Sequence, residues 1–183
     1  MAMLRNPHIC YTQIDHLSGN SGIEDSFQIK PARSATDLEA IARLFKAYAT
    51  SLGIDLTFQD FTTELATLPG KYKPPDGELL LAHDIHGQAV GCVALRALQP
   101  AGCCEMKRLY VSLEGRGLGL GKGLIDAIVN EAVRIGYREM RLDTLPTMTA
   151  AIALYGKAGF VPIEPYYDTP LEETVFLGRL LAP

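Results

Sequence analysis

The chain has 183 residues, a length that favours one domain with enough residues to bury a substantial core. Apolar residues make up 48% and charged residues 21%, which excludes a disordered or fibrous chain and is typical of a soluble globular protein. The formal net charge of −4 argues against nucleic acid or an anionic membrane as main partner. No apolar run approaches the roughly 20 residues that a membrane span needs.

The N-terminal segment, residues 1–26, shows no periodic pattern and is expected to be a flexible extension before a single domain at 27–183. It has no basic start followed by an apolar stretch, so no secretory signal is expected. The four cysteines form no C-x-x-C pair. Free thiols in a reducing, cytoplasmic compartment are therefore expected.

Local patterns predict the elements of the first half. Thr36 and Glu39 have the spacing of a capping box at the start of a helix, and Gly53 is placed to end that helix. The segment 83–87 contains two histidines and an aspartate, but it is interpreted as a solvated turn because no further His or Cys cluster accompanies it. Around these features, strands are expected at 27–30, 79–83 and 89–95, with a second short helix at about 58–68.

The second half alternates strands with helices. Segment 104–111 is predicted to be a strand with charge and apolar side chains mixed on both faces, which is unusual for a core strand. By alternation, one face would carry Glu105, Lys107, Leu109 and Val111, and the other Met106, Arg108 and Tyr110. The remaining elements are expected to be a helix at 119–135, a strand ending at 143–144, a helix at 148–158, and strands at 160–163 and 174–181. This order predicts an α/β or mixed α+β protein.

The clearest chemical signal is the run Arg-Gly-Leu-Gly-Leu-Gly-Lys-Gly at 116–123, between a predicted strand and a predicted helix. Glycines allow close approach of the backbone to a ligand and permit positive φ. The N–H groups at a helix start lack intrahelical partners, and the helix dipole is positive there. With Arg116 and Lys122 adding charge, the run predicts a phosphate-binding loop.

Two common phosphate motifs do not fit this run. A P-loop would need glycine where Arg116 stands and Ser or Thr where Gly123 stands. A dinucleotide fingerprint begun at Gly117 would need glycine in place of Lys122. The pattern that fits is Arg-x-x-Gly-x-Gly, formed by Arg116, Gly119 and Gly121.

That pattern resembles the pyrophosphate loop of the GNAT superfamily of N-acetyltransferases. Leu109-Tyr110-Val111 resembles the family strand whose backbone pairs with the pantetheine arm, and the segment 151–160 resembles the family's A-x-x-L-Y-x-x-x-G-F run. Together these motifs cover about residues 104–161 in the family's order. The resemblance implies a mixed α+β fold, with a central, mostly antiparallel twisted sheet of about six to seven strands flanked by about four helices.

The resemblance also implies the function. It predicts an enzyme, an N-acetyltransferase that passes the acetyl group of acetyl-CoA directly to a primary amine of a small molecule or peptide, with no metal. The cofactor contacts carried over from the motifs are Leu109, Val111, Arg116, Gly117, Leu118, Gly119, Leu120, Gly121 and Lys122. One departure is Met148, which stands where the family often has Asn; that contact is lost or is supplied by Thr147 or Thr149.

Two catalytic residues follow from the resemblance. Tyr155 is the candidate general acid that protonates the departing thiolate. Glu105 precedes Arg116 at the spacing of the base glutamate in the histone-acetylating branch, so it is the candidate general base, with a strand-surface or ion-paired glutamate and a water base as the alternatives. Cys103 and Cys104 are expected to be buried thiols, because no motif pairs them with a histidine.

The acceptor side is expected to include Tyr48, Phe58 and Tyr166. Their aromatic character, with nearby acidic residues, suits a small cationic amine or amino compound better than a polyanion. Two alternatives stay open: a non-catalytic, regulatory acyl-CoA-binding module, and a transferase for another acyl-CoA. By analogy with the family, a homodimer through strand 174–181 is also open.

Overall fold

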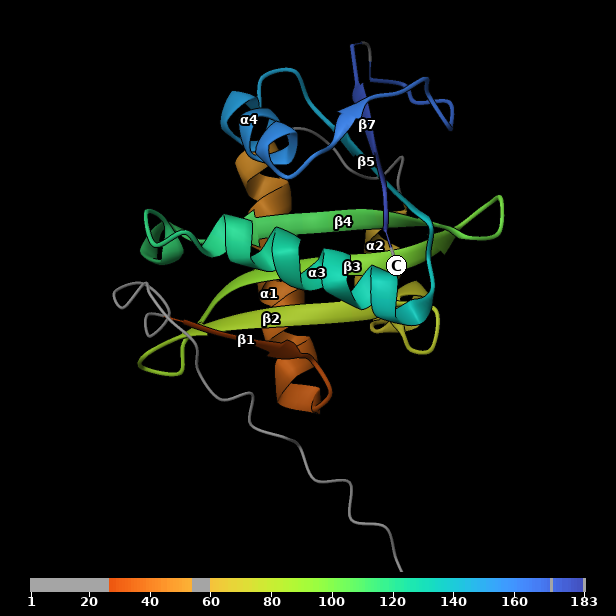
Figure 1. The fold of residues 1–183 in the computed structure, drawn as a ribbon. Coiled ribbons are helices and arrows are strands. Elements are labelled where there is room, and N and C mark those ends of the chain that lie inside the picture. The colour runs from red at the N-terminus through yellow and green to blue at the C-terminus, as the bar shows by residue number, and fades with distance from the viewer. Residues whose placement is uncertain (1–26, 54–59, 172, 183) are drawn as a thin grey trace, which may run out of the picture.

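The computed structural model describes residues 27–53, 60–171 and 173–182, and the predicted extension at 1–26 lies outside them. Seven strands form one sheet in the order β1-β2-β3-β4-β5-β7-β6 (Figure 1). Neighbouring strands are antiparallel except β4 and β5, which are parallel. The strands are β1 (Phe27–Pro31), β2 (Glu78–Asp84), β3 (Ala89–Leu98), β4 (Cys103–Val111), β5 (Glu139–Thr144), β6 (Val161–Pro162) and β7 (Val175–Leu180).

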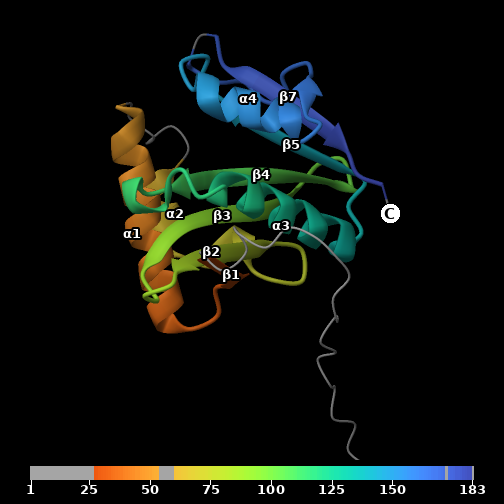
Figure 2. The same ribbon diagram turned by 60° about the vertical axis from the view of Figure 1, so that its left-hand side comes forward.

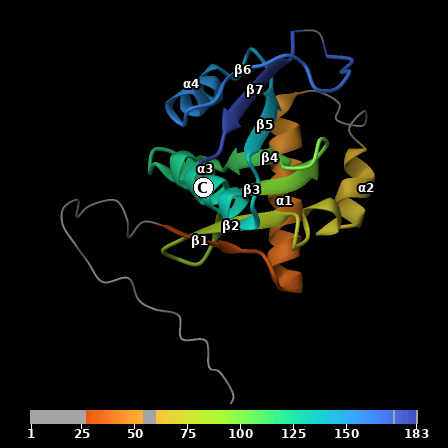
Figure 3. The same ribbon diagram turned by 45° about the vertical axis from the view of Figure 1, so that its right-hand side comes forward.

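Helices cover both faces of the sheet. One face packs against α3, and α1 with α2 lies on the opposite face (Figure 3). The helices are α1 (Ala35–Leu52), α2 (Phe61–Ala66), α3 (Leu120–Ile135) and α4 (Thr149–Lys157), with short 3-10 turns at Gly70–Tyr72 and Leu113–Gly115. The predicted mixed α+β fold with a mostly antiparallel sheet is therefore confirmed.

The start of α1 differs from the prediction. Ser34, not Thr36, is the N-cap residue, and its hydroxyl accepts a hydrogen bond from the N–H of Asp37 at 3.1 Å. The Asp37 carboxylate accepts in return from the N–H of Ser34 at 3.0 Å. This pair has the same three-residue spacing and lies two positions earlier, so the helix gains extra length at its start. The predicted end at Gly53 is confirmed by its left-handed φ of 64°.

A β-bulge interrupts β4. Lys107 lies opposite Ala94, whereas Tyr110 lies opposite Cys92, so β4 contains one residue more than β3 over this stretch. Arg108 has a φ of 58° in the left-handed region, which is the backbone conformation that accommodates the extra residue.

The bulge reverses the faces of β4. Before it, Cys104 and Met106 belong to the core on the α3 side; after it, Leu109 and Val111 pack against that same core. Tyr110 instead packs on the α1 side. The prediction that Leu109 and Val111 share a face with Glu105 was therefore wrong, because strict alternation fails where a strand carries an extra residue.

The bulged residue Arg108 forms a buried ion pair. Arg108 donates two hydrogen bonds of 2.9 Å to the carboxylate of Glu64 in α2, and both residues are buried. Tyr72 donates to the same carboxylate at 2.9 Å, and Lys71 lies 3.1 Å from it. Burial alone would raise the pKa of Glu64, but these contacts outweigh it and lower the pKa to about 2.

We expect Glu64→Gln to lower the free energy of unfolding by about 3–5 kcal/mol at pH 7, because it leaves Arg108 buried without a counter-charge. Since folding lowers the pKa of Glu64 from 4.5, its contribution is complete above pH 4.5 and is lost as the pH falls toward 2. Urea unfolding across this range tests both statements. The control is Glu131→Gln, which removes an exposed pair with Arg134 and is expected to cost about 1 kcal/mol or less. Equal losses for the two variants would contradict the prediction.

Candidate active site

The sheet opens between its two parallel strands. β4 and β5 pair only from Cys103–Glu139 to Glu105–Arg141, near the start of both strands. Beyond that point β5 turns away from β4, as Figure 2 shows from the side. A groove of about 800 Å³ lies where the strands have separated, and it is bordered by the end of β4 and the first residues of α3 and α4.

The glycine run forms one wall of this groove and begins α3. Gly117 and Gly119 have φ values of 80° and 75°, so the left-handed backbone that the loop requires is suited to glycine. Gly119 is the N-cap of α3, and the first N–H groups of the helix have no intrahelical partners. Arg116 and Lys122 line the same groove. Donors, dipole and two cations therefore fit a phosphate group.

Most of the predicted cofactor contacts lie together. The lining includes Leu109, Val111, Arg116, Gly117, Gly119, Leu120, Gly121 and Lys122. Leu118 is 39% exposed, and it does not line the groove. Met148, at the position where the family often has Asn, also lines the groove together with Thr147 and Thr149.

A small inner cavity of about 40 Å³ adjoins the groove. That volume holds roughly three water molecules. The two spaces share walls made by Tyr48, Leu52, Leu109, Leu145 and Met148. The inner cavity is thus the place where a group carried along the groove would meet a second molecule.

Tyr155 of α4 lies in the wall of the inner cavity, and its ring packs against Phe160. Burial raises the pKa of Tyr155 well above its usual range, so the phenol is protonated at neutral pH. Tyr48, near the end of α1, also lines the inner cavity. Burial raises its pKa to about 12. Two protonated phenols therefore border this space.

Asp143 and Lys107 bring charge to the same cavity. Lys107 Nζ lies 2.7 Å from Asp143 Oδ1, and both residues line the cavity. Asp143 comes from the end of β5 and Lys107 from β4 just before the bulge, so the separation of the two strands places the pair at the mouth of the opening. Neither residue was predicted to belong to the site.

Glu105 lies elsewhere. Its carboxylate is fully buried, accepting from Arg96 Nε at 2.5 Å and from the Tyr166 hydroxyl at 2.6 Å. It lines neither the groove nor the inner cavity. The ion-paired state that was an alternative to the base role is the one observed. Burial and the neighbouring negative charge of Glu105 raise the pKa of Tyr166, so this phenol remains a donor.

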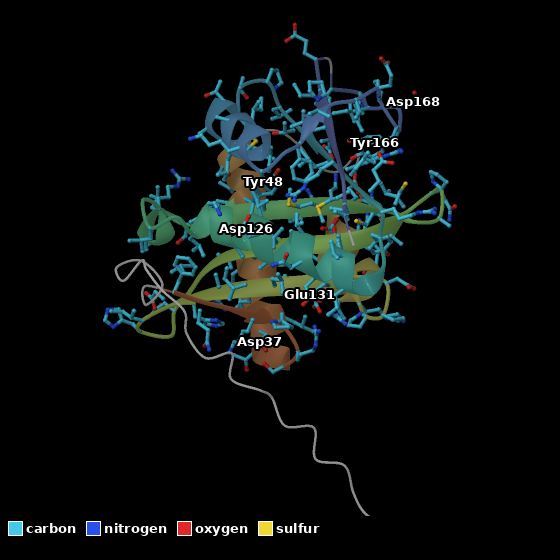
Figure 4. The ribbon with its side chains drawn as sticks, viewed as in Figure 1. Asp37, Tyr48, Asp126, Glu131, Tyr166 and Asp168 are labelled. Carbon is cyan, nitrogen blue, oxygen red and sulfur yellow. The ribbon has the colours of Figure 1, made fainter. Side chains whose placement is uncertain are left out.

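The three predicted acceptor residues do not lie together. Tyr48 lines both spaces, whereas Tyr166 supports Glu105 from the segment that follows β6, near Asp168 (Figure 4). Phe58 lies outside the described residues. Three residues that were not predicted, Lys107, Asp143 and Tyr167, line the inner cavity. The mixed charge predicted for segment 104–111 was a sequence signal for Lys107 alone, because Asp143 and Tyr167 lie in other segments.

Two further observations concern metal-binding groups and membrane-spanning helices. Among the residues that the structure describes, no three His, Cys, Asp or Glu side chains gather as a metal-binding group. Within the same residues, no helix has the length and apolar character that crossing a membrane requires. The described residues form an α+β protein with a groove beside the glycine loop and a small inner cavity that adjoins the groove.

Comparison with known proteins identifies the family. The model of the acetyltransferase (GNAT) family matches residues 38–160. An uncharacterized N-acetyltransferase of Schizosaccharomyces pombe is 43% identical over 152 residues, covering 83% of this chain and 93% of the relative. An uncharacterized N-acetyltransferase of Dictyostelium discoideum is 31% identical over 212 residues, with coverages of 83% and 98%.

Solved structures agree with this assignment. A GNAT-family acetyltransferase from Staphylococcus aureus superposes with a TM-score of 0.72 at 21% identity, covering 86% of this chain and all of that chain. At this identity the likeness concerns the fold alone. The chain belongs to the GNAT family of acetyltransferases, and the predicted membership is confirmed.

Proposed function

We propose that the protein is an acetyl-CoA-dependent N-acetyltransferase that acts on a primary amine. The observation that carries the proposal is the continuity of two spaces: a groove with a phosphate-binding loop leads to an inner cavity walled by Tyr155. The acetyl donor is proposed from the membership of the chain in the GNAT family of acetyltransferases.

The groove fits the coenzyme by three features. The N–H groups at the start of α3, with Arg116 and Lys122, would hold its phosphates. Leu109 and Val111 lie on β4 beyond the last residue that pairs with β5. Their backbone groups on that side would pair with the amides of the pantetheine arm.

Acetyl-CoA supplies a thioester, whose carbonyl carbon forms a bond with the acceptor nitrogen as the bond to sulfur breaks. Tyr155 would donate its phenolic proton to the departing sulfur, because burial keeps the phenol protonated and the ring lies in the wall of the inner cavity. The protein would hold the two reactants in adjoining spaces, so proximity contributes much of the rate enhancement.

Glu105 is less suited to the role of general base than the sequence indicated. Glu105 lines neither the groove nor the inner cavity, and its carboxylate is bonded to Arg96 and Tyr166. Asp143 is the carboxylate that lines the inner cavity. We propose that the proton of the amine passes to Asp143, directly or through one water molecule, and that Glu105 positions Arg96 and Tyr166.

The test is release of free thiol when acetyl-CoA is mixed with a panel of primary amines, with the acetylated product identified by mass spectrometry. The proposal expects equal amounts of thiol and acetylated amine. Binding of acetyl-CoA without turnover of any amine would favour a non-catalytic binding module. Faster thiol release with succinyl-CoA or longer acyl-CoA would assign another donor.

A further inference from the structure

A third space, called here the outer cavity, lies beside the inner one. Its volume is about 420 Å³, and it shares Lys107 and Tyr167 with the inner cavity. Its walls are formed by Asp60, Lys71, Arg96, Lys107, Tyr167, Asp168 and Pro170. Three cations, Lys71, Arg96 and Lys107, therefore line the outer cavity, whereas Tyr155 lines only the inner one.

Two of these cations keep hydrogen-bonding capacity. Arg96 donates through Nε to Glu105 at 2.5 Å, and within the described residues neither of its Nη groups makes a hydrogen bond. A guanidinium has five N–H donors, so most of them are available to a ligand. Lys107 bonds Asp143 at 2.7 Å and lies 3.8 Å from Glu105, which leaves donor capacity on its ammonium group as well.

The carboxylates behind these cations are already paired. Glu105 accepts from Arg96 and Tyr166, and Glu64 accepts from Arg108 and Tyr72 beside Lys71. The carboxylates that remain in the wall, Asp60 and Asp168, are exposed. Water screens exposed charges strongly, whereas Lys107 is only 9% exposed and Arg96 is 29% exposed. Glu105 and Asp143 offset the charges of Arg96 and Lys107, so what the deep part of the outer cavity offers is free N–H donors, which suit the oxygens of a carboxylate.

Asp143 and Arg96 lie at the two ends of a row of charged side chains. Its contact with Lys107, and the proximity of Lys107 to Glu105, link it to Arg96 through two side chains. A ligand with an ammonium group near Asp143 and a carboxylate near Arg96 would thus satisfy both neighbouring cavities. A planar guanidinium matches the geometry of a carboxylate by two parallel hydrogen bonds.

We infer that the acceptor is an amino acid or a close analogue, whose carboxylate is bound by Arg96 and Lys107 in the outer cavity while its amine enters the inner one. This inference rests on the proposed function. It differs from the cationic amine that the sequence favoured. The basic residues come from β3, β4 and the 3-10 turn before β2, which the sequence pattern did not bring together.

The test compares acceptors in matched pairs that differ only in the carboxylate. L-Phenylalanine, L-leucine, L-methionine and L-lysine are assayed with acetyl-CoA beside their decarboxylated amines. The amino acid of the preferred pair is expected to have a kcat/KM at least about tenfold above that of its amine, since one hydrogen-bonded charge contributes this much or more. Calorimetry with the N-acetylated amino acid and the N-acetylated amine measures the same preference without turnover.

The decisive variant is Arg96→Gln combined with Glu105→Gln, which removes both charges of a buried pair and so limits the loss of stability. It is expected to raise KM for the amino acid about 10- to 100-fold and to leave KM for the matched amine unchanged. Arg96→Lys should restore part of the preference. Arg134→Gln, on the exposed side of α3, is the matched control and should leave both values unchanged.

The outcomes separate the inference from the proposed function. If amines react as well as amino acids, the inference is wrong and the acetyltransferase proposal stands. If N-acetylated amino acids bind in an Arg96-dependent manner but no acceptor releases thiol, the binding site stands and the acetyltransferase proposal fails. If acetyl-CoA binds while no carboxylate compound binds or reacts, the inference is overturned.

Discussion

Gly119→Glu together with Arg116→Ala is expected to abolish measurable binding of acetyl-CoA in calorimetry. Open space surrounds the position of a Cβ at Gly119, so the new side chain fits sterically, but its carboxylate would stand where phosphate oxygens are expected. Such like-charge contacts cost several kcal/mol, and the positive φ of 75° adds backbone strain. We expect Kd to rise about 100- to 1,000-fold.

The same helix offers a matched control. Gly136 follows the last residue of α3, also has a positive φ and also has open space around it. Gly136→Glu therefore introduces similar strain at the end of α3 opposite to the phosphate loop. It should lower the melting temperature to a comparable degree without changing Kd. If the double variant binds within about threefold of the unmodified protein, the phosphate-loop assignment is wrong and the run is only a tight turn.

Tyr155→Phe is expected to lower kcat by about 100-fold or more while leaving the Kd of acetyl-CoA unchanged. General acids contribute roughly 10²- to 10⁴-fold to the rate, and the substitution removes only the phenolic oxygen from a buried ring. Tyr155 lines the inner cavity but not the groove, so coenzyme binding should not depend on it. Steady-state kinetics and calorimetry on the same preparation measure the two quantities.

Tyr137→Phe is the control for this change. The Tyr137 hydroxyl donates to the backbone oxygen of Asp76, and Tyr137 lines neither the groove nor the inner cavity. Its loss should affect stability slightly and kcat not at all. A Tyr155→Phe variant with unchanged kcat would remove Tyr155 from the mechanism.

Much of the fold was predictable because its signals are local. The glycines at 53 and 136 end their helices with left-handed backbone as predicted, and β7 lies within one residue of the predicted strand at both ends. The bulge at Arg108 was not predictable, since one extra residue in a strand leaves no compositional mark. It nevertheless accounts for the mixed character of 104–111, where each predicted face combined residues from both real faces.

Within the site, too, only the part that is encoded by consecutive residues was predictable. The position of the glycine loop beside the groove was predictable because its residues are consecutive, and all but Leu118 of the predicted cofactor contacts line the groove. The cavities beyond it were not, since Asp143 and Tyr167 come from β5 and the segment after β6, and only the folded sheet brings them to Lys107. Glu105 shows the limit of spacing as a guide. Its position along the strand fits a base, but its side chain is paired with Arg96 and Tyr166 and lines neither the groove nor the inner cavity.

The early separation of β4 from β5 has a consequence for the backbone itself. On the side that faces the groove, Leu109 to Val111 have no strand partner among the described residues. Backbone groups left there must be hydrogen-bonded to water until another molecule replaces it. Their amide hydrogens should accordingly exchange rapidly with deuterated solvent in the free protein and slowly once the groove is filled. Occupancy of the groove could thus be followed in this one strand, independently of any chemical turnover.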